Sequence, residues 1–234
     1  MANGLRPSRS RNDVSLIRSL MFKPVIWKTF PRDFLVIQIA FMLFGIAIAL
    51  MIRSNLGTTP WAVFEVALSQ HAQIRPGRMS ILVGFVVLLG ALALREKIGW
   101  GTLTNILFIG LWQDFFLSLI PPVHAQPVIQ GAMLFLTISI MGFASPLYIG
   151  VQAGAGPRDS LMLAVHRTTG ISIRLARAII EISIVTIGWS LDGPLGIGTV
   201  IHAVLIGPVV QWAFKLLKVE AHKPETRVVE AVTD

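Results

Sequence analysis

Long uncharged stretches separated by short polar turns run through the middle of the chain. Phe34–Ile52 and Val128–Val151 contain no charged residue. Each stretch is long enough to cross about 30 Å of hydrocarbon as a helix that rises about 1.5 Å per residue. The pattern predicts an all-α polytopic membrane protein with six transmembrane helices. The other four apolar stretches are Met79–Leu94, Thr102–Ile120, Arg174–Leu191 and Thr199–Phe214.

The same pattern occurs twice along the chain. Shifted by 97 residues, the sequence aligns with itself without a gap from Gly45 to Gly207. Glycines and prolines carry the match, and such residues mark places where backbone conformation or close approach is constrained. Gly57 falls on Gly154 and Pro60 on Pro157. We interpret the chain as two tandem membrane repeats, a plan common among transporters.

Each repeat is expected to contain a long helix, a Gly/Pro break, a short helix and two further long helices. The breaks are Leu56–Pro60 and Ala153–Pro157, and the short helices are Trp61–His71 and Arg158–Arg167. Pro60 and Pro157 suit the first turn of a helix, where no backbone N–H is needed. The predicted organisation is a single membrane domain made of a tail (1–33), repeat 1 (34–120), a linker (121–127), repeat 2 (128–218) and a C-terminal tail (219–234).

The short helices decide the topology. If each dips into the membrane and returns, the chain has six transmembrane helices plus two short re-entrant helices, and the repeats are inverted. If each spans, there are eight crossings with parallel repeats. The placement of lysine and arginine favours inversion, because it leaves the linker 121–127 uncharged on the outside.

The basic charge of the chain follows the membrane pattern. The net charge is +8, yet residues 1–33 hold seven arginines and lysines against two aspartates. Such a tail is typical of a cytoplasmic N-terminus, and we expect an interfacial helix over Val14–Phe30. The pI of about 10.8 therefore indicates contact with the lipid bilayer and no nucleic-acid partner.

Several classes of chemistry lack the residues they need. The chain has no cysteine, and its five histidines show no metal-ligand spacing. We expect no metal site and no cofactor. Motifs of hydrolases, metalloproteases and nucleotide-binding loops are missing as well, so we expect that the protein is not an enzyme.

The second break is the first half of a candidate substrate-binding site. Gly154 and Gly156 would let backbone approach a ligand, and the helix that follows opens with Arg158 and Asp159. A helix N-terminus presents free N–H groups and a positive dipole end. The alternative is structural: Asp159 suits the first turn of the helix, and Arg158 neutralises it.

The first break is the other half of that site. Gly57 and Thr58 would present amides and a hydroxyl, Pro60 would start the short helix, and Trp61 would stack on or gate a substrate. The alternative is an interfacial tryptophan beside threonines that cap a helix.

Glu181 lies in an otherwise apolar run, Ala178–Leu191. We expect it to pair across helices, with Arg158 as its partner, and to act as a proton or charge relay. The alternative is a permanent ion pair between helices that stabilises the fold.

The motifs resemble those of the bacterial YczE/YitT-type integral membrane proteins. The resemblance rests on Leu56–Trp61, on Gly154–Met162 with its Gly-Pro-Arg-Asp block, and on Gly196–Thr199, and the YczE branch fits better. It covers nearly all of residues 34–214. It implies a bacterial inner-membrane protein and leaves the substrate open. Ala62 stands where the pattern has an aspartate, which argues against a symmetric pair of acidic sites.

These observations predict a small secondary transporter or exporter of a polar, anionic or zwitterionic small-molecule solute. It would be a multi-pass protein of the bacterial inner (plasma) membrane, with both termini cytoplasmic. The alternative is a non-transporting membrane accessory protein that supports a partner or a biosynthetic pathway. The small size of the chain is compatible with a homodimer under either hypothesis.

Overall fold

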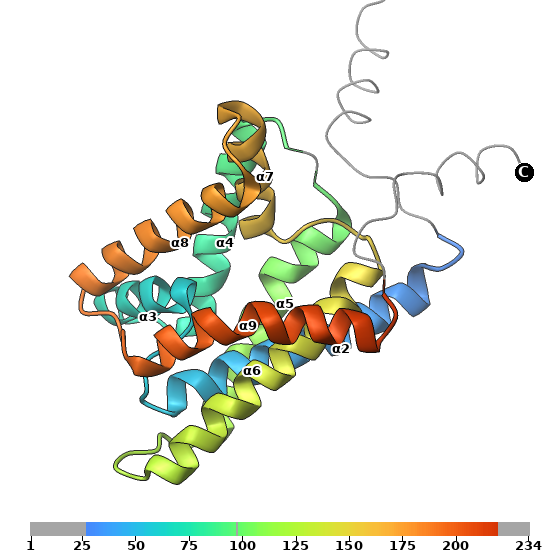
Figure 1. Ribbon diagram of the computed structural model, residues 1–234. Helices are drawn as coiled ribbons and strands as arrows, with labels where there is room; N and C mark the ends of the chain where they lie inside the picture. Colours follow the sequence, from blue (N-terminus) through green and yellow to red (C-terminus); the bar gives the residue numbers. More distant parts are fainter. Residues whose placement is uncertain (1–26, 97, 220–234) are drawn as a thin grey trace, which may run out of the picture.

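The computed structural model describes residues 27–96 and 98–219. Most of the predicted interfacial helix and nearly all of the C-terminal tail lie outside these ranges. The described residues form an all-helical fold, as the hydrophobic pattern predicts (Figure 1). Its helices are α2 (Phe30–Arg53), α3 (Pro60–Ala72), α4 (Pro76–Ala93), α5 (Trp100–Leu119), α6 (Pro127–Gly150), α7 (Pro157–Thr169), α8 (Ile173–Ser190) and α9 (Ile197–Leu216).

The two longest helices, α2 and α6, form an antiparallel pair at the centre of the fold. Thr137 of α6 donates a hydrogen bond of 3.0 Å to the Ala47 carbonyl of α2. Gln130, near the start of α6, donates one of 2.7 Å to the Ser54 carbonyl, just after α2 ends. We call the end of the molecule where α2 begins the first end, and the end where α2 stops the second end.

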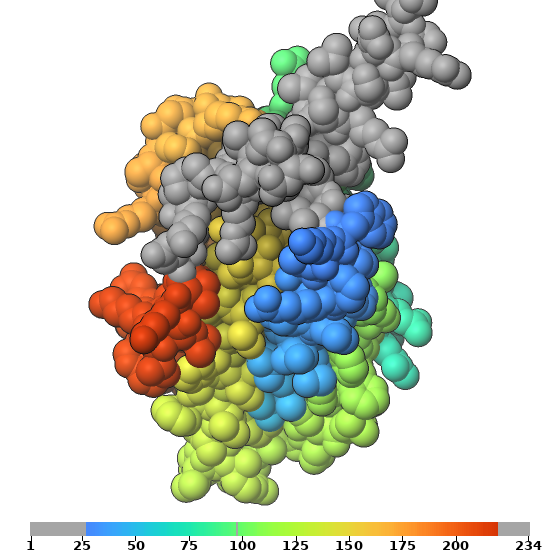
Figure 2. Space-filling view, turned by 90° about the vertical axis from the view of Figure 1, so that its right-hand side faces the viewer, coloured from blue at the N-terminus to red at the C-terminus, as the bar shows by residue number. Residues whose placement is uncertain are grey.

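Helices α5 and α9 flank this pair on opposite sides (Figure 1). The start of α5 lies at the first end, where the ring of Trp100 stacks on that of Phe34 at 6.4 Å. Its far end reaches the second end, where Arg53 donates to the Leu117 carbonyl. Helix α9 packs against α6 (Figure 2). It runs opposite to α5, because Gly198 near its start donates to the Leu56 carbonyl at the second end.

Each Gly/Pro break is bonded to the start of a helix from the other half of the chain. The Leu56 carbonyl accepts from the Gly198 amide at 2.7 Å, and the Ala153 carbonyl accepts from the Gly101 amide at 3.0 Å. Partners in the two bonds differ by 97 residues. The first break is therefore anchored at the second end of the molecule, and the second break at the first end.

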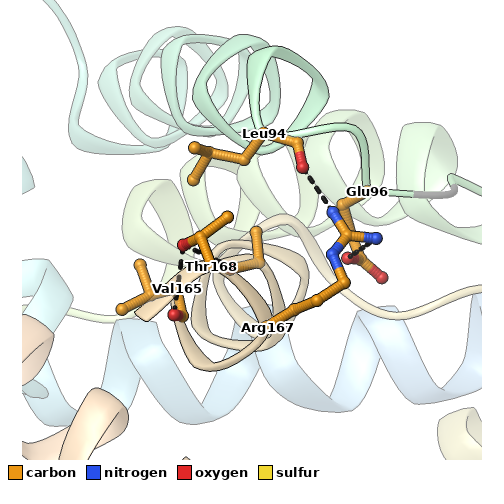
Figure 3. A network of polar contacts seen from close by, with 6 residues as sticks. Leu94, Glu96, Val165, Arg167 and Thr168 are labelled. Carbon is orange, nitrogen blue, oxygen red and sulfur yellow. Dashed lines mark hydrogen bonds and ion pairs between the residues drawn. The ribbon is translucent and has the colours of Figure 1, made fainter. Parts of the chain in front are cut away.

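Each short helix returns to the end at which its break begins. Helix α3 leads into α4. The Gly77 amide of α4 donates a hydrogen bond of 2.7 Å to the Asp114 carboxylate, near the end of α5. Helix α7 finishes at the opposite end of α4. There Arg167 donates to the Leu94 carbonyl and pairs with Glu96 at 3.4 Å (Figure 3).

Among the described helices, five are long and apolar enough to cross a membrane. They are α2, α4, α5, α6 and α9. The sixth expected crossing, α8, has 18 residues but carries Arg174, Arg177 and Glu181. Large apolar side chains such as Val86, Phe135 and Val204 are exposed on the surface. Such exposure is costly in water and natural against lipid.

Candidate functional site

The first break, Leu56–Pro60, leads into α3 as extended chain. Thr59 directly precedes α3 with an extended ψ of 153°, and Pro60 follows in the first turn. Thr58 is fully buried, and its amide donates to the Thr199 hydroxyl at 3.1 Å. The Thr58 hydroxyl has no hydrogen-bond partner among the described residues. A buried polar atom of this kind costs free energy unless a water or a ligand satisfies it.

The second break, Ala153–Pro157, has the same backbone conformation before its helix. Gly156 precedes α7 with ψ 160°, and Pro157 occupies the first turn. The Ala155 carbonyl accepts from the Thr102 hydroxyl at 2.6 Å. Both segments thus deliver a helix N-terminus into the interior, and α3 and α7 begin close to one another.

A cluster of Trp61, Glu65 and Arg158 joins these two helix starts. The Arg158 guanidinium lies 4.8 Å from the centroid of the Trp61 ring and forms an ion pair with Glu65. Trp61 and Glu65 are one helical turn apart, so both project from the same face of α3. The Glu65 side chain is 2% exposed, whereas that of Arg158 is 35% exposed. The cluster therefore presents a guanidinium at the edge of a buried carboxylate.

The surroundings of Glu65 are polar on a second side. The Ser80 hydroxyl of α4 lies beside the carboxylate. Because Arg158 also stacks on Trp61, cation–π attraction adds to the ion pair. Both contacts limit the orientations that the guanidinium can adopt.

Asp159, the next residue along α7, faces a different group of charges. Its side chain is exposed, and Arg177 and Arg158 attract its carboxylate while Glu181 repels it. Arg177 and Glu181 of α8 pair with one another at 2.9 Å. Asp159 therefore lies at a mixed-charge surface formed by α7 and α8.

The structure corrects the expected partner of Glu181. Arg158 pairs with Glu65, and Glu181 pairs with Arg177 instead. Four residues separate Arg177 from Glu181, which places both on one helix face and makes a local pair favourable. That spacing was a usable signal in the sequence, and the interhelical hypothesis overlooked it.

The eight residues expected to bind substrate separate into two sets. Trp61, Arg158 and Asp159 gather at the starts of α3 and α7. Gly57 and Gly154 instead lie at opposite ends of the molecule, with φ of 103° and 129°. Because they have no side chain, the backbone of the other half can approach them closely, at Gly196 and Gly99 respectively. The remaining three, Thr58, Pro60 and Gly156, connect these positions.

Glu65 and Ser80 were not among the expected site residues. Glu65 follows Trp61 by one turn and is the only charged residue of α3 when histidine is neutral. Its isolation in that helix was the signal that could have identified it. Ser80 carried no signal, because only the packing of α4 against α3 brings it to Glu65.

A pocket of about 260 Å³ opens beside the first break. It lies at the second end, between the break and the turn that precedes α9. Its walls are mostly apolar, with Asn55 as the polar side chain. The lining residues are Ile52, Asn55, Leu56, Gly57, Pro194, Leu195, Gly196 and Ile197.

Comparison with known proteins identifies the family. Residues 31–215 match the model of a family of unknown function, DUF6198. The chain belongs to the DUF6198 family. This match covers all but the first and last residues of the helical region from α2 to α9. The five apolar helices, together with a relative that is named a membrane protein, place the chain among membrane proteins.

Relatives of this DUF6198 chain occur in Haemophilus influenzae and Bacillus subtilis. An uncharacterised protein of Haemophilus influenzae is 33% identical over 202 residues, which cover 85% of this chain and 91% of the relative. The uncharacterised membrane protein YczE of Bacillus subtilis is 30% identical over 175 residues, covering 73% and 79%. The resemblance to YczE-type proteins is thereby confirmed. No solved structure matches the chain.

Proposed function

We propose that this protein is a small secondary transporter or exporter of a polar, anionic or zwitterionic molecule, and not an enzyme. It would lie in the bacterial inner membrane with both termini in the cytoplasm. Its two halves would be inverted repeats, each made of three crossing helices and one re-entrant helix.

The anchoring of the two breaks supports inversion. The first break and the end of α3 lie at the second end, and the second break and the end of α7 lie at the first end. A segment that begins and finishes at one end of the molecule does not cross it. Helices α3 and α7, with 13 residues each, are also shorter than the ~20 residues that a crossing needs.

One observation carries the proposal: segments anchored at opposite ends touch at Trp61 and Arg158. Trp61 follows Leu56 by five residues, and Arg158 follows Ala153 by five. Five extended residues span at most about 17 Å. The contact therefore lies between the two ends, at a depth where charged side chains are expensive and typically serve a pathway.

The same cluster indicates the kind of molecule that would bind. Glu65 is buried and occupied by Arg158, so it is not free to hold a cation. Arg158 has more N–H donors than one carboxylate uses, and about a third of its side chain is exposed. A negatively charged or zwitterionic group could bind the remaining donors, with Trp61 as an apolar wall beside it.

Two-sided access to a single cysteine tests the transport mechanism. The chain has no native cysteine, so Asp159→Cys introduces the only thiol, at an exposed position. A matched control is Ala62→Cys, which lies 97 residues earlier and is 2% exposed. Each variant is reacted with a membrane-impermeant maleimide in right-side-out and in inside-out vesicles.

A transporter that opens alternately would expose residue 159 to the reagent in both vesicle orientations, whereas residue 62 would stay unreactive. Reaction of residue 159 from one side alone, at every pH and ion gradient tried, would contradict the proposal. It would favour the non-transporting accessory protein, since such a protein needs no alternating opening.

A further inference from the structure

The Glu65 carboxylate is enclosed and has a single counter-charge. Its side chain is 2% exposed, and apolar side chains of α4, α7 and α8 surround its neighbour Trp61. Helices α4 and α8 pack on α3, and α7 brings Arg158 to it. Among the described charged groups of these helices, only Arg158 acts on the Glu65 carboxylate, and the Ser80 hydroxyl is a neutral polar neighbour. The negative charge of Glu65 therefore depends on one guanidinium.

That guanidinium acts on more than one acid. Arg158 also attracts Asp159, on which Arg177 and Glu181 act as well. In this group of linked charges, two arginines face three acids, Glu65 included. An anionic group of a substrate that reaches Arg158 therefore meets no unpaired positive charge. Neutralising one of the acids with a proton would remove the repulsion that such an anion meets.

Burial selects Glu65 as the acid that is neutralised. A buried carboxylate that must share its counter-charge loses what keeps it ionised, because burial disfavours the charged form. Glu181 differs, since its side chain is 31% exposed and pairs with Arg177 at 2.9 Å. Asp159 is exposed as well. Water can stabilise the charges of Glu181 and Asp159, whereas it has little access to Glu65.

Arg158 has a contact that does not depend on the charge of Glu65. Its guanidinium lies 4.8 Å from the centroid of the Trp61 ring, and cation–π attraction holds it there whether Glu65 is ionised or neutral. A protonated Glu65 can donate a hydrogen bond to the Ser80 hydroxyl beside it or accept one from it. The cluster thus offers favourable contacts in both protonation states, as a site that binds and releases a proton requires.

We propose that Glu65 is a proton-binding site coupled to the substrate, whose anionic group binds at Arg158 together with one proton. The proton comes from water on the open side of the protein and forms an O–H bond with the Glu65 carboxylate. It returns to water when the substrate leaves and Arg158 again neutralises Glu65 alone. This assignment rests on the transport function proposed above and names its coupling ion.

Binding of benzenesulfonate to the purified protein in detergent tests the assignment. This probe has an anionic group for Arg158 and an aromatic ring for the Trp61 wall. Its sulfonate stays ionised and contains no carbonyl group, so a proton taken up on binding, or a new carboxylic-acid C=O band in the infrared spectrum, belongs to the protein. Benzenesulfonamide has the same ring without the charge and is the neutral comparison compound.

The assignment predicts that benzenesulfonate binding raises the pH of a weakly buffered solution and produces a carboxylic-acid C=O band, and that benzenesulfonamide does neither. Because one proton enters with each anion, the Kd of benzenesulfonate should increase about tenfold for each unit of rising pH, as long as Glu65 is ionised in the free protein. Glu65→Gln should abolish the proton uptake, the band and the pH dependence. Glu181→Gln neutralises a more exposed acid and is the matched control, which should leave all three unchanged.

A Kd of benzenesulfonate that does not change with pH would overturn the assignment, and so would proton uptake that persists in Glu65→Gln. Absence of binding to the wild-type protein would overturn it too, since no anion would then reach Arg158. If Glu65→Gln does not fold, Glu65→Asp takes its place, because it keeps an acid at this position. Glu65→Asp should retain the proton uptake with a displaced C=O band, and an undisplaced band would overturn the assignment.

The proton site and the transport function can fail separately. If Asp159→Cys reacts from both sides while benzenesulfonate binds without a proton, transport stands and the assignment of Glu65 falls. If proton uptake depends on Glu65 while Asp159→Cys reacts from one side alone, the protein has a proton-linked anion site and the transport proposal falls.

Discussion

Glu65 and Arg158 form an ion pair across 93 residues of sequence, in which the Glu65 carboxylate is buried and the Arg158 side chain is partly exposed. The pair ties together two segments that are anchored at opposite ends of the molecule. The pair adds a link between the two short helices to the backbone bonds that already join the two halves. Movement of either short helix would then displace the other through the Arg158 guanidinium.

Breaking this pair should destabilise the protein strongly. Arg158→Gln leaves the Glu65 carboxylate buried without a counter-charge, which costs on the order of 3–5 kcal/mol. The loss should appear as a large drop in the thermal unfolding midpoint in mild detergent. Glu65→Gln combined with Arg158→Gln should recover part of it, because no charge is then left unpaired.

Arg177→Gln is the matched control for that experiment. It removes the partner of Glu181 in a pair whose side chains are 59% and 31% exposed. Exposed pairs contribute about 0–1 kcal/mol, so the midpoint should barely move. Equal destabilisation by Arg158→Gln and Arg177→Gln would mean that the Glu65 pair does not have the special role given to it.

The first glycine of each break should tolerate no side chain. At Gly57 a Cβ would lie 2.5 Å from the Gly196 amide nitrogen, and at Gly154 it would lie 2.8 Å from the Gly99 Cα. Both residues also have positive φ. Gly57→Ala and Gly154→Ala should therefore reduce the yield of folded protein sharply, as measured by size-exclusion chromatography after membrane extraction.

Gly170→Ala separates backbone strain from steric overlap. Gly170 has φ of 75°, and a Cβ there would meet nothing within 4 Å. Strain alone costs about 1–3 kcal/mol, so this variant should remain folded with a lowered unfolding midpoint. If Gly57→Ala behaved no worse than Gly170→Ala, the close approach of the break to α9 would not be essential.

The sequence predicts the helices well because their boundaries carry local signals. Pro60, Pro157 and the Gly-Thr pairs mark helix starts whatever lies around them. Two starts shift by three or four residues: α4 begins at Pro76 and not at Met79, and α2 begins at Phe30 and not at Phe34. Pro31 and Asp33 in its first turn were the missed signals, since both residues favour a helix N-terminus.

The candidate site could be predicted only in part, because its contacts form between distant segments. Trp61 and Arg158 stood out as large or charged residues next to Gly/Pro breaks. The pairing of Arg158 with Glu65 depends on how α3 meets α7, and no local pattern encodes that meeting. Gly57 and Gly154 were expected to approach a ligand, whereas they approach the backbone of α9 and α5. The sequence pattern does not distinguish these two uses of a glycine.

Asp114 should act as the cap of α4. Its carboxylate accepts from the amides of Gly77 and Arg78, at 2.7 and 3.2 Å. Asp114→Ala should lower stability by about 1–2 kcal/mol, because two amides at the helix start lose their acceptor. Thermal unfolding in detergent would measure the loss.

Gln211 lies 97 residues after Asp114 and is exposed. Gln211→Ala should leave the unfolding midpoint unchanged, since α8 packs mainly against α3 and α7, whereas its counterpart α4 packs closely against α5. If Asp114→Ala and Gln211→Ala lowered the unfolding midpoint equally, the result would argue against the difference in packing between the two halves.

The inverted arrangement of the two halves is the central claim, and the sidedness of two single cysteines tests it most directly. Ala125→Cys lies in the exposed linker at the second end, and Gly170→Cys lies after α7 at the first end. Whole cells are treated with a membrane-impermeant maleimide before and after lysis. Inverted repeats predict that residue 125 reacts in intact cells and residue 170 only after lysis. Reaction of both residues under the same condition, whether in intact cells or only after lysis, would contradict the account.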